Sequence, residues 1–367
     1  MKSKYKRLGD YIRQVDVRNV DDKRYELLGV SVEKCFISSI ANTVGTDWHN
    51  YKIIKKGQFC YIPDTSRRGD KIGIAHLVDR EIGLVSAVYT VFEVWNRELI
   101  PEYLMLWFKR PEFDRYARYH SHGSVREIFD WEEMCNVALP VPPIEEQEKI
   151  VDAYQKIETR IALKKKINEN LEATAQAIYN KIFVEDIDYS ILPAGWHFSA
   201  LKDVAELSAG GDRPLVFSNV QTEACSIPIF SNGIENEGLY GFTDKAKISD
   251  ESVTVSARGT VGYVFLREKP YVPIVRLISV IPDQKYLTAQ YLYFALTAID
   301  FQSTGTSQQQ ITVPDFAKCQ VLIPSHTHMT NFMNKINPIF ALKNKNKSEM
   351  RNLTKLLEML LTKLTSC

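Results

Sequence analysis

The stretch IVDAYQKIETRIALKKKINENLEATAQAIYNKI, residues 150–182, decides the fold of this chain. Apolar residues recur along it at alternating spacings of four and three, which is the a/d pattern of a coiled-coil helix. A helix with one apolar face of this kind needs a partner that covers the face. The apolar seam positions of this first copy are Ile150, Tyr154, Ile157, Ile161, Leu171, Ala175, Ile178 and Ile182.

The same pattern occurs a second time near the C-terminus. Leu171 corresponds to Leu353, a shift of 182 residues (353 − 171), and the correspondence runs without a gap over about 142–181 and 324–363. Two matched helices of this kind bury their stripes most simply against each other. The apolar seam positions of the second copy are Phe332, Ile336, Ile339, Met350, Leu353, Leu357, Leu360 and Leu364. Polar residues, which fix the register at a cost in stability, interrupt the centre of both seams: Lys164 and Asn168, then Lys343 and Asn346.

Length and composition are those of an ordinary globular protein. With 367 residues, of which 45% are hydrophobic and 25% charged, the chain has room for two or three domains. Its six cysteines are scattered without a Cys-x-x-Cys pair, which predicts neither a zinc site nor a disulfide framework. No apolar stretch approaches the ~20 residues of a membrane helix, and no apolar signal core follows the basic N-terminus. We therefore expect a cytoplasmic protein with reduced thiols and no membrane contact.

The formal net charge of +1 does not by itself indicate a nucleic-acid partner, but basic residues cluster in two stretches. Such a cluster either forms a positive face for phosphates or is solvated surface with compensating acids nearby in space, and the sequence favours neither. The first stretch contains Lys52, Lys55, Lys56, Arg67, Arg68, Lys71 and Arg80, and the second contains Lys109, Arg110, Arg115, Arg118 and Arg126.

The repeat divides the chain into four segments. We expect a first globular domain over residues 1–143, a spacer helix over 144–185, a second globular domain over 186–324 and a second spacer helix over 325–367. The globular segments share short anchors, such as Tyr103-Leu104 and Tyr291-Leu292, and little between them. This arrangement favours one fold used twice on two different ligands over two copies that drifted under weak constraint.

The first globular segment mixes strand and helix patterns. Residues 84–94 are rich in β-branched and aromatic side chains and predict one strand. Pro101 suits the first turn of a helix that follows it. The prolines within 137–144 exclude regular helix before the spacer, and the acids of 145–148 suit the first turn of the spacer helix.

Catalytic motifs are absent from the sequence. The chain has no G-x-x-x-x-G-K-[ST] phosphate loop, no G-x-S-x-G elbow and no H-E-x-x-H pair. The Pro-Pro pair at 142 and 143 lacks the preceding Asn or Asp of an amino-methyltransferase pocket. We therefore expect a chain that does not catalyse a reaction by itself.

Two loops in equivalent positions carry the side chains best suited to reading DNA. They cover residues 123–128 and 305–311, each between the Tyr-Leu helix and the strand that leads to the spacer. Gln bonds the edge of adenine, Arg bonds that of guanine, and Ser or Thr bonds a base or a phosphate. Plain polar loops have the same composition, so the equivalent placement is the main argument for a role in recognition. The loop candidates are Ser124, Arg126, Thr306, Ser307, Gln308, Gln309 and Gln310, and the other candidates are Arg67, Arg68, Lys71, Arg118, Ser231, Asn232, Arg258 and Thr260.

Two variable globular segments, each followed by a Pro-ended strand and a long seam helix, make the whole chain resemble the DNA-specificity subunit of a type I restriction-modification system. The most specific stretch is LPVPPIEEQEKI at 139–150, followed by NENL at 168–171, which is similar to the central region of that family. The segment STGTSQQQI at 303–311 is similar to the loop at the end of its target-recognition domain. The second copy departs from the pattern at 325–328, where Ser-His-Thr-His replaces Pro-Ile-Glu-Glu.

The resemblance implies an α+β protein in which two mixed α/β target-recognition domains are separated by two long antiparallel coiled-coil helices, with a pseudo-twofold internal repeat. Each domain would read one half of a bipartite DNA site, and the helices would set the half-site spacing. The implied partners are double-stranded DNA, two methyltransferase subunits docked along the helices and a restriction motor-nuclease subunit. S-adenosylmethionine and ATP with Mg²⁺ would belong to those subunits, with no cofactor in this chain. The alternative is a coiled-coil adaptor whose two domains bind protein partners and not DNA.

Overall fold

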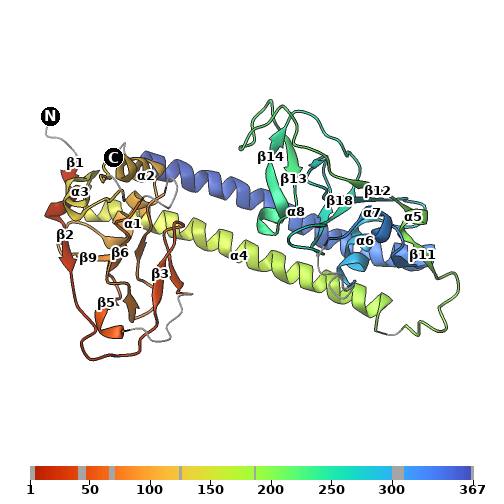
Figure 1. The fold of residues 1–367 in the computed structure, drawn as a ribbon, viewed down its shortest axis with the longest axis horizontal. Coiled ribbons are helices and arrows are strands. Elements are labelled where there is room, and N and C mark those ends of the chain that lie inside the picture. Colours follow the sequence, from red (N-terminus) through yellow and green to blue (C-terminus); the bar gives the residue numbers. More distant parts are fainter. Residues whose placement is uncertain are drawn as a thin grey trace. The chain divides into compact units, whose positions relative to one another are not determined.

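The computed structural model describes residues 5–39, 47–65, 71–123, 126–185, 187–299 and 310–364. Its chain divides into two compact units (Figure 1). Unit 1 contains residues 1–166 and 346–367, and unit 2 contains residues 167–345. Each unit therefore combines one globular region with one part of each long helix.

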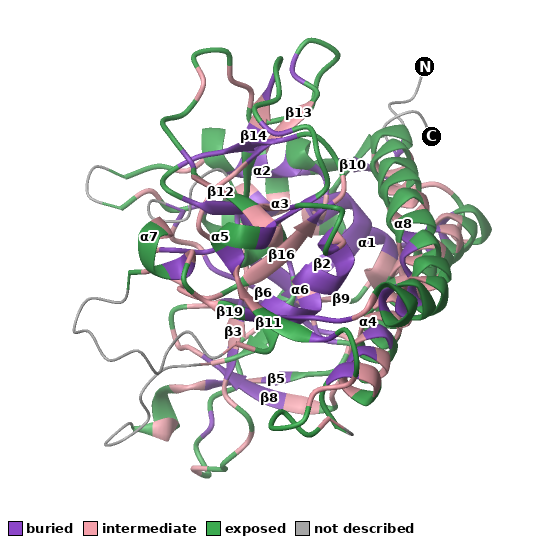
Figure 2. Cartoon of the chain, turned by 90° about the vertical axis from the view of Figure 1, so that its right-hand side faces the viewer, coloured by how far each residue is buried: buried purple, intermediate pink, exposed green. Residues whose placement is uncertain are grey.

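Two long helices carry the heptads. Helix α4 spans Ile144–Phe183 and helix α8 spans His326–Lys363, so the segments predicted as spacers hold helices of 40 and 38 residues. Acidic side chains in the first turn of α4 and a lysine in its last turn suit the helix dipole. Every seam position, apolar or polar, is buried or half-buried. Much of the remaining surface of α8 is exposed, as Figure 2 shows in green.

The two helix segments run antiparallel within each unit. In unit 1, Tyr154 near the start of α4 and Leu364 just after α8 are buried in one apolar cluster. In unit 2, Phe183 at the end of α4 shares a cluster with Phe332 near the start of α8. Both clusters also contain side chains of the globular region, so each apolar stripe covers a domain core as well as the other helix. The predicted fold class is confirmed.

Unit 1 is built around a four-stranded antiparallel sheet with the order β2-β9-β6-β7. Helix α1 (Pro101–Phe108) begins at the predicted proline, and its side chains from Tyr103 onward are buried against the sheet. The strands of the sheet are β2 (Ile12–Val15), β9 (Thr90–Val94), β6 (Phe59–Tyr61) and β7 (Ile74–His76). The other elements are β1 (Tyr5–Arg7), η1 (Leu8–Asp10), β3 (Leu28–Val30), β4 (Phe36–Ser38), η2 (Trp48–Asn50), β5 (Lys52–Lys55), β8 (Ile82–Val85), α2 (Pro111–Tyr119), α3 (Trp131–Asn136) and β10 (Ala138–Pro140).

The single strand predicted over residues 84–94 is wrong. The structure divides this stretch between β8 and β9, with a turn between them in which the Tyr89 amide donates to the Ser86 carbonyl (3.0 Å). Strand β8 pairs with β5, whereas β9 lies between β2 and β6. The turn contains neither glycine nor proline, so the sequence pattern carries no sign of the break.

Unit 2 has a corresponding four-stranded antiparallel sheet with the order β12-β18-β15-β16. A smaller sheet has the order β14-β13-β17, in which β13 and β17 are parallel. The core of unit 2 centres on Phe332. The centroid of its ring lies 5.2 Å from that of Phe183 and 6.1 Å from that of Phe294. The elements are β11 (His197–Ala200), α5 (Leu201–Val204), β12 (Ala205–Ala209), β13 (Ile227–Phe230), η3 (Glu235–Gly238), β14 (Leu239–Thr243), β15 (Ser252–Val255), β16 (Val264–Arg267), β17 (Val272–Pro273), β18 (Ile278–Pro282), α6 (Ala289–Thr297), α7 (Val313–Phe316) and β19 (Gln320–Ile323).

The two units share a frame and differ in its contents. In each, an antiparallel strand pair precedes the long helix, β1 with β10 in unit 1 and β11 with β19 in unit 2. The Tyr103 hydroxyl donates to the Pro140 carbonyl (3.2 Å), and the Tyr291 hydroxyl donates to the Leu322 carbonyl (2.7 Å). Pro140 and Leu322 are related by the shift of 182 residues (322 − 140). Helix α2 has no counterpart among the described residues of unit 2, which instead has the β14-β13-β17 sheet.

Candidate nucleic-acid interface

In unit 1 the first candidate loop lies against the hairpin formed by β6 and β7. The Phe129 amide donates to the Pro63 carbonyl (2.9 Å), and Asp64 pairs with Ile128 in an isolated antiparallel bridge. Asp130, which follows Phe129, caps α3 through its side chain. The loop is therefore fixed at its C-terminal end, beside Pro63 and Asp64.

In unit 2 the last two residues of the second candidate loop, Gln310 and Ile311, are held in the same way by the hairpin formed by β15 and β16. The Ile311 amide donates to the Ala257 carbonyl (3.0 Å), and Arg258 pairs with Gln310 in an antiparallel bridge. Thr312 then caps α7. Ile311 and Phe129 are related by the same shift of 182 residues (311 − 129), so the equivalence of the two loops extends to their backbone contacts.

In unit 1 the residues that lead into β7 are fixed to α2 by a buried carboxylate. Asp114 Oδ1 lies 2.5 Å from Lys34 Nζ and accepts a hydrogen bond from the Ile72 amide (3.1 Å). Burial lowers the pKa of Lys34, and the carboxylate of Asp114 opposes that shift. This contact therefore positions Ile72, two residues before β7.

Two predicted DNA contacts of unit 1 are engaged with carboxylates. Arg118 Nη1 lies 2.9 Å from a carboxylate oxygen of Glu127 and donates to the Thr65 carbonyl (3.1 Å). Lys71 Nζ lies 2.8 Å from a carboxylate oxygen of Glu33. Arg118 therefore joins the hairpin to the candidate loop, and its contact with DNA stays a prediction.

Most of the described cations in the two basic stretches lie within ion-pair distance of an acid. A paired cation offers less charge to a phosphate, so for these residues the structure favours locally neutralised surface over an open positive face. Lys55 and Arg126 have no such partner among the described residues. The pairs are Lys52 with Asp16, Lys56 with Glu81, Lys71 with Glu33, Arg80 with Glu26 and Asp79, Lys109 with Glu158, Arg110 and Arg115 with Glu112, and Arg118 with Glu127.

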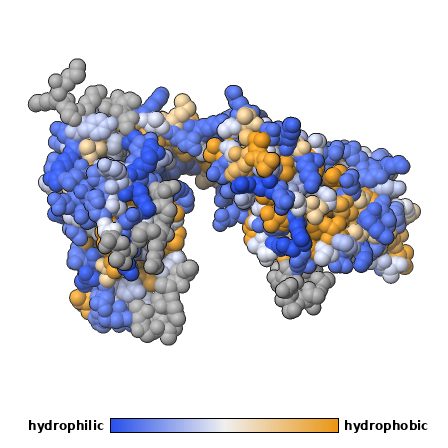
Figure 3. Space-filling model, turned by 45° about the horizontal axis from the view of Figure 1, so that its top comes forward, coloured by the Kyte–Doolittle hydropathy of each residue, from blue (hydrophilic) through white to orange (hydrophobic). Residues whose placement is uncertain are grey.

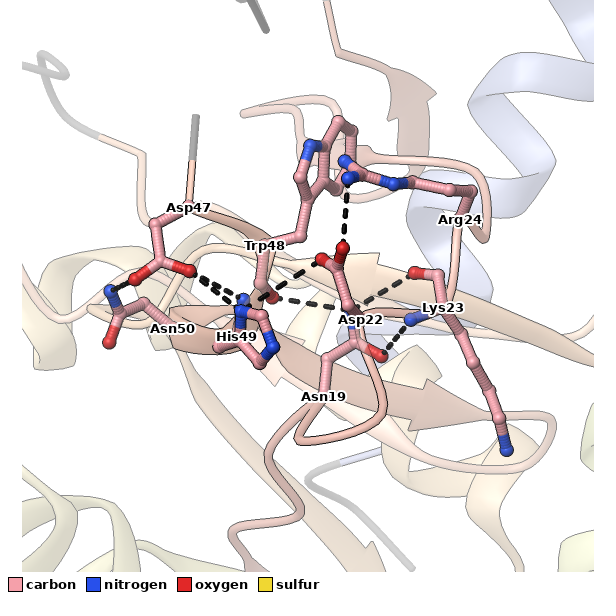
Figure 4. A network of polar contacts seen from close by, with 8 residues as sticks. All are labelled: Asn19, Asp22, Lys23, Arg24, Asp47, Trp48, His49 and Asn50. Atoms are coloured by element: carbon pink, nitrogen blue, oxygen red, sulfur yellow. Dashed lines mark hydrogen bonds and ion pairs between the residues drawn. The ribbon is translucent and has the colours of Figure 1, made fainter. Parts of the chain in front are cut away.

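A polar network in unit 1 holds one arginine in a fixed orientation (Figure 4). Its residues form no sequence motif, so the sequence did not identify them. Asn19 is fully buried, and its amide nitrogen donates to the carbonyls of Lys23 (3.0 Å) and Trp48 (3.2 Å), which joins two loops. The guanidinium of Arg24 lies over the Trp48 ring, 4.7 Å from its centroid, and donates to Asp22 (2.9 Å). An exposed guanidinium that is stacked and bonded in this way is ordered without being buried.

In unit 2, Asn232 is a structural residue. Its Oδ1 accepts a hydrogen bond from the Ala257 amide (2.7 Å), and its Nδ2 donates to the Val275 carbonyl (2.6 Å). These bonds tie the segment after β13 to the end of β15, beside Arg258. The nearby Arg258 and Thr260 are half-buried, and within the described ranges Arg258 Nε and Thr260 Oγ1 have no hydrogen-bond partner.

A hollow of about 390 Å³ opens between the β13–β14 connection and the β15–β16 hairpin. Figure 3 shows apolar surface on unit 2, and the exposed apolar side chains of this unit include Ile234 and Leu239, which line the hollow. The full lining is Ser231, Gly233, Ile234, Glu235, Gly238, Leu239 and Thr260.

The structure thus brings several sequence candidates of unit 2 together. Gln310 and Arg258 are bridged, Thr260 follows two residues later, and Ser231 lies with Thr260 around one hollow. The remaining candidates Arg67, Arg68, Ser124, Thr306, Ser307, Gln308 and Gln309 lie outside the described residues.

The centres of the helix seams are polar in both units. In unit 1, Lys164 Nζ donates to Asn346 Oδ1 (2.9 Å) and lies 2.8 Å from a carboxylate oxygen of Glu349, which also pairs with Arg160. In unit 2, the Asn168 amide nitrogen donates to the Lys343 carbonyl (3.3 Å). The Lys343 ammonium pairs with Glu172.

Neither a metal site nor a membrane helix is found in the described parts of the chain. Across these ranges, no three His, Cys, Asp or Glu side chains gather as metal ligands. Each helix within them is too short or too polar to cross a bilayer.

Comparison with known proteins agrees with this geometry. A family model described as the type I restriction modification DNA specificity domain matches residues 11–173 and 193–352, one match for each copy. A protein of Mycoplasma pneumoniae named as a type I specificity subunit is 30% identical over 260 residues, which cover 69% of this chain and 68% of that one. The HindI specificity subunit of Haemophilus influenzae is 22% identical over 97% of each chain. The crystal structure of a type I restriction-modification S subunit from M. genitalium shares the fold, with a TM-score of 0.58, 13% identity and coverage of 98% and 95%.

Proposed function

This chain belongs to the type I restriction-modification DNA specificity family, and we propose that it reads a bipartite DNA site, one half with each globular region. The resemblance seen in the sequence is thereby confirmed, and the adaptor alternative is not favoured. The observation that supports the two-half reading is the matched pair of bridged loops. Asp64 with Ile128 in unit 1 and Arg258 with Gln310 in unit 2 hold different side chains in one backbone geometry.

The helices would set the spacing between the two half-sites. Their apolar stripes are buried in both units, and polar residues fix the register at the centre of each seam. A matched heptad added to both helices lengthens each by about 10 Å, which corresponds to roughly three base pairs of B-DNA. We expect the unspecified gap in the target to grow by that amount.

The family implies that this chain recognises DNA without catalysing a reaction. We propose that the catalytic steps belong to partner subunits. In this proposal two methyltransferase subunits dock along the helices and bind S-adenosylmethionine, and a motor-nuclease subunit binds ATP and Mg²⁺. The chain itself holds no cofactor, and its role is to recognise the DNA sequence. Its place of action is the cytoplasm, where the DNA lies.

Methylome sequencing tests this function directly. A strain that carries the chain should methylate one split motif, and deletion of the chain should remove that motif and leave other methylation unchanged. Replacing residues 187–299 by those of a family member with another target should change only one half of the motif. A wild-type chain without any associated split motif, or an exchange that alters both halves, would refute the proposal.

A further inference from the structure

One wall of the hollow in unit 2 is held by a buried cation. Arg267 is 3% exposed, and its guanidinium donates to the Glu237 carbonyl (2.6 Å) and to Thr254 Oγ1 (2.9 Å). The same guanidinium lies 3.6 Å from the centroid of the Phe230 ring. Three fixed contacts from one planar group leave the segment before β14 little freedom.

The backbone of that wall is strained. Asn236 (φ 49°) and Glu237 (φ 58°) are both in the left-handed region, where side chains other than glycine are uncommon. Gly238 (φ 80°) follows, and a Cβ there would lie 2.4 Å from the Ser231 carbonyl oxygen. Strain of this kind persists only where the surroundings enforce it, and it clusters at functional sites.

The other wall carries hydrogen-bonding capacity that the protein does not use. Thr260 lines the hollow, and its hydroxyl oxygen is buried without a hydrogen-bond partner among the described residues. A buried hydroxyl without a hydrogen bond is rare in native proteins and needs an explanation. Glu235, also part of the lining, is exposed and forms no ion pair or hydrogen bond with the described residues.

We propose that this hollow receives the major-groove edge of a base that carries an exocyclic amino group, adenine or cytosine, with the Glu235 carboxylate and the Thr260 hydroxyl as acceptors. The inference rests on the proposed function and names the chemistry of one recognition site within it. An ionised carboxylate is repelled by phosphates, so a glutamate in a DNA-reading surface is favourable only where it accepts from a base amino group. Threonine bonds either kind of base, so the specificity comes from Glu235.

Two substitutions test the site by methylome sequencing of the strain with its natural partner subunits. Glu235→Ala removes the carboxylate at an exposed position, and Thr260→Val removes the hydroxyl while it keeps the shape of the side chain. Glu206→Ala, which removes an exposed acid on strand β12 outside the lining, is the matched control. The thermal midpoint of each purified full-length chain is measured in parallel.

We expect Glu235→Ala to make one adenine or cytosine position in one half of the motif degenerate, with discrimination reduced about ten-fold or more. Thr260→Val should weaken the same position although its thermal midpoint is equal to or above that of the wild type, because it removes an unpaired buried group. Glu206→Ala should keep the wild-type motif.

Two outcomes would overturn the inference. Either the motif of the Glu235→Ala strain is unchanged, or Thr260→Val is more stable and reads the motif as the wild type does. A wild-type strain without a split motif would instead refute the proposed function itself, so the two failures are distinguishable.

Discussion

Replacing Asn346 by leucine should destabilise unit 1, even though leucine is the better residue for an apolar seam. Asn346 is 1% exposed, and its Oδ1 accepts a hydrogen bond from Lys164 Nζ at 2.9 Å. Leucine removes this bond and leaves the half-buried ammonium its ion pair to Glu349 at 2.8 Å. A hydrogen bond to a charged group contributes about 1.5–3 kcal/mol. The added apolar burial offsets part of that loss, so we expect a net destabilisation of about 1–2 kcal/mol.

A double-mutant cycle separates the pair from the rest of the seam. Lys164→Leu combined with Asn346→Leu replaces the polar pair by an apolar one, and we expect this variant to be as stable as the wild type or more stable. The free energy of unfolding is measured on the full chain by urea titration. Asn352→Leu makes the same change at an exposed position of α8 and should stay within about 0.5 kcal/mol of the wild type.

The reasoning fails if Asn346→Leu alone is as stable as the wild type, because the Lys164–Asn346 bond would then contribute nothing to the folded state. A functional readout accompanies the cycle. Since a polar seam position specifies register, the double variant should methylate sites with more than one gap length, whereas the wild type should use a single gap. A single unchanged gap would show that the register is set elsewhere.

Three further changes probe unit 2 and the core of unit 1. Arg267→Lys keeps a charge but loses the planar contacts to Glu237, so recognition by unit 2 should weaken while unit 1 still reads its half; methylome sequencing measures both. Phe332→Ala empties a fully buried site and should cost about 3–5 kcal/mol in urea unfolding. His76 has a pKa lowered by burial and stacks on Phe59 at 4.4 Å. The unfolded chain therefore binds the proton more readily, and stability falls as the pH drops below about 6.5. His76→Phe should reduce that fall in the thermal midpoint between about pH 7.5 and 5.5.

The sequence predicted the helices well because a heptad is a local pattern of side chains. The expected spacers 144–185 and 325–367 contain α4 and α8, which end within a few residues of those bounds. The strand over 84–94 was wrong because the alternation of apolar residues continues through a turn without glycine or proline. Periodicity reports which face of an element is buried, and it does not report where the chain reverses.

The candidate site was predictable only in part, since its contacts join distant segments. The equivalent loops were visible as a repeat, whereas the bridge of Arg258 to Gln310 spans residues that no local pattern connects. Arg267 is buried against Phe230, although arginine in a sequence is read as surface. Likewise the orientation of Arg24 is determined by stacking on Trp48, which lies in another loop, and neither residue belongs to a motif.

The polar seam residues show why two copies of one helix are not interchangeable. The shift of 182 residues relates Lys164 to Asn346, and in unit 1 these two residues bond to each other. The same shift relates Ile161 to Lys343 and Asn168 to Met350. In unit 2 Asn168 donates to the Lys343 carbonyl, whereas their repeat-related counterparts in unit 1, Ile161 and Met350, are apolar and half-buried. Burying a polar group beside an apolar one costs free energy, so a copy of one helix in the place of the other would mismatch these positions. The departure from exact repetition therefore favours one antiparallel register, and with it one spacing between the two halves of the DNA site.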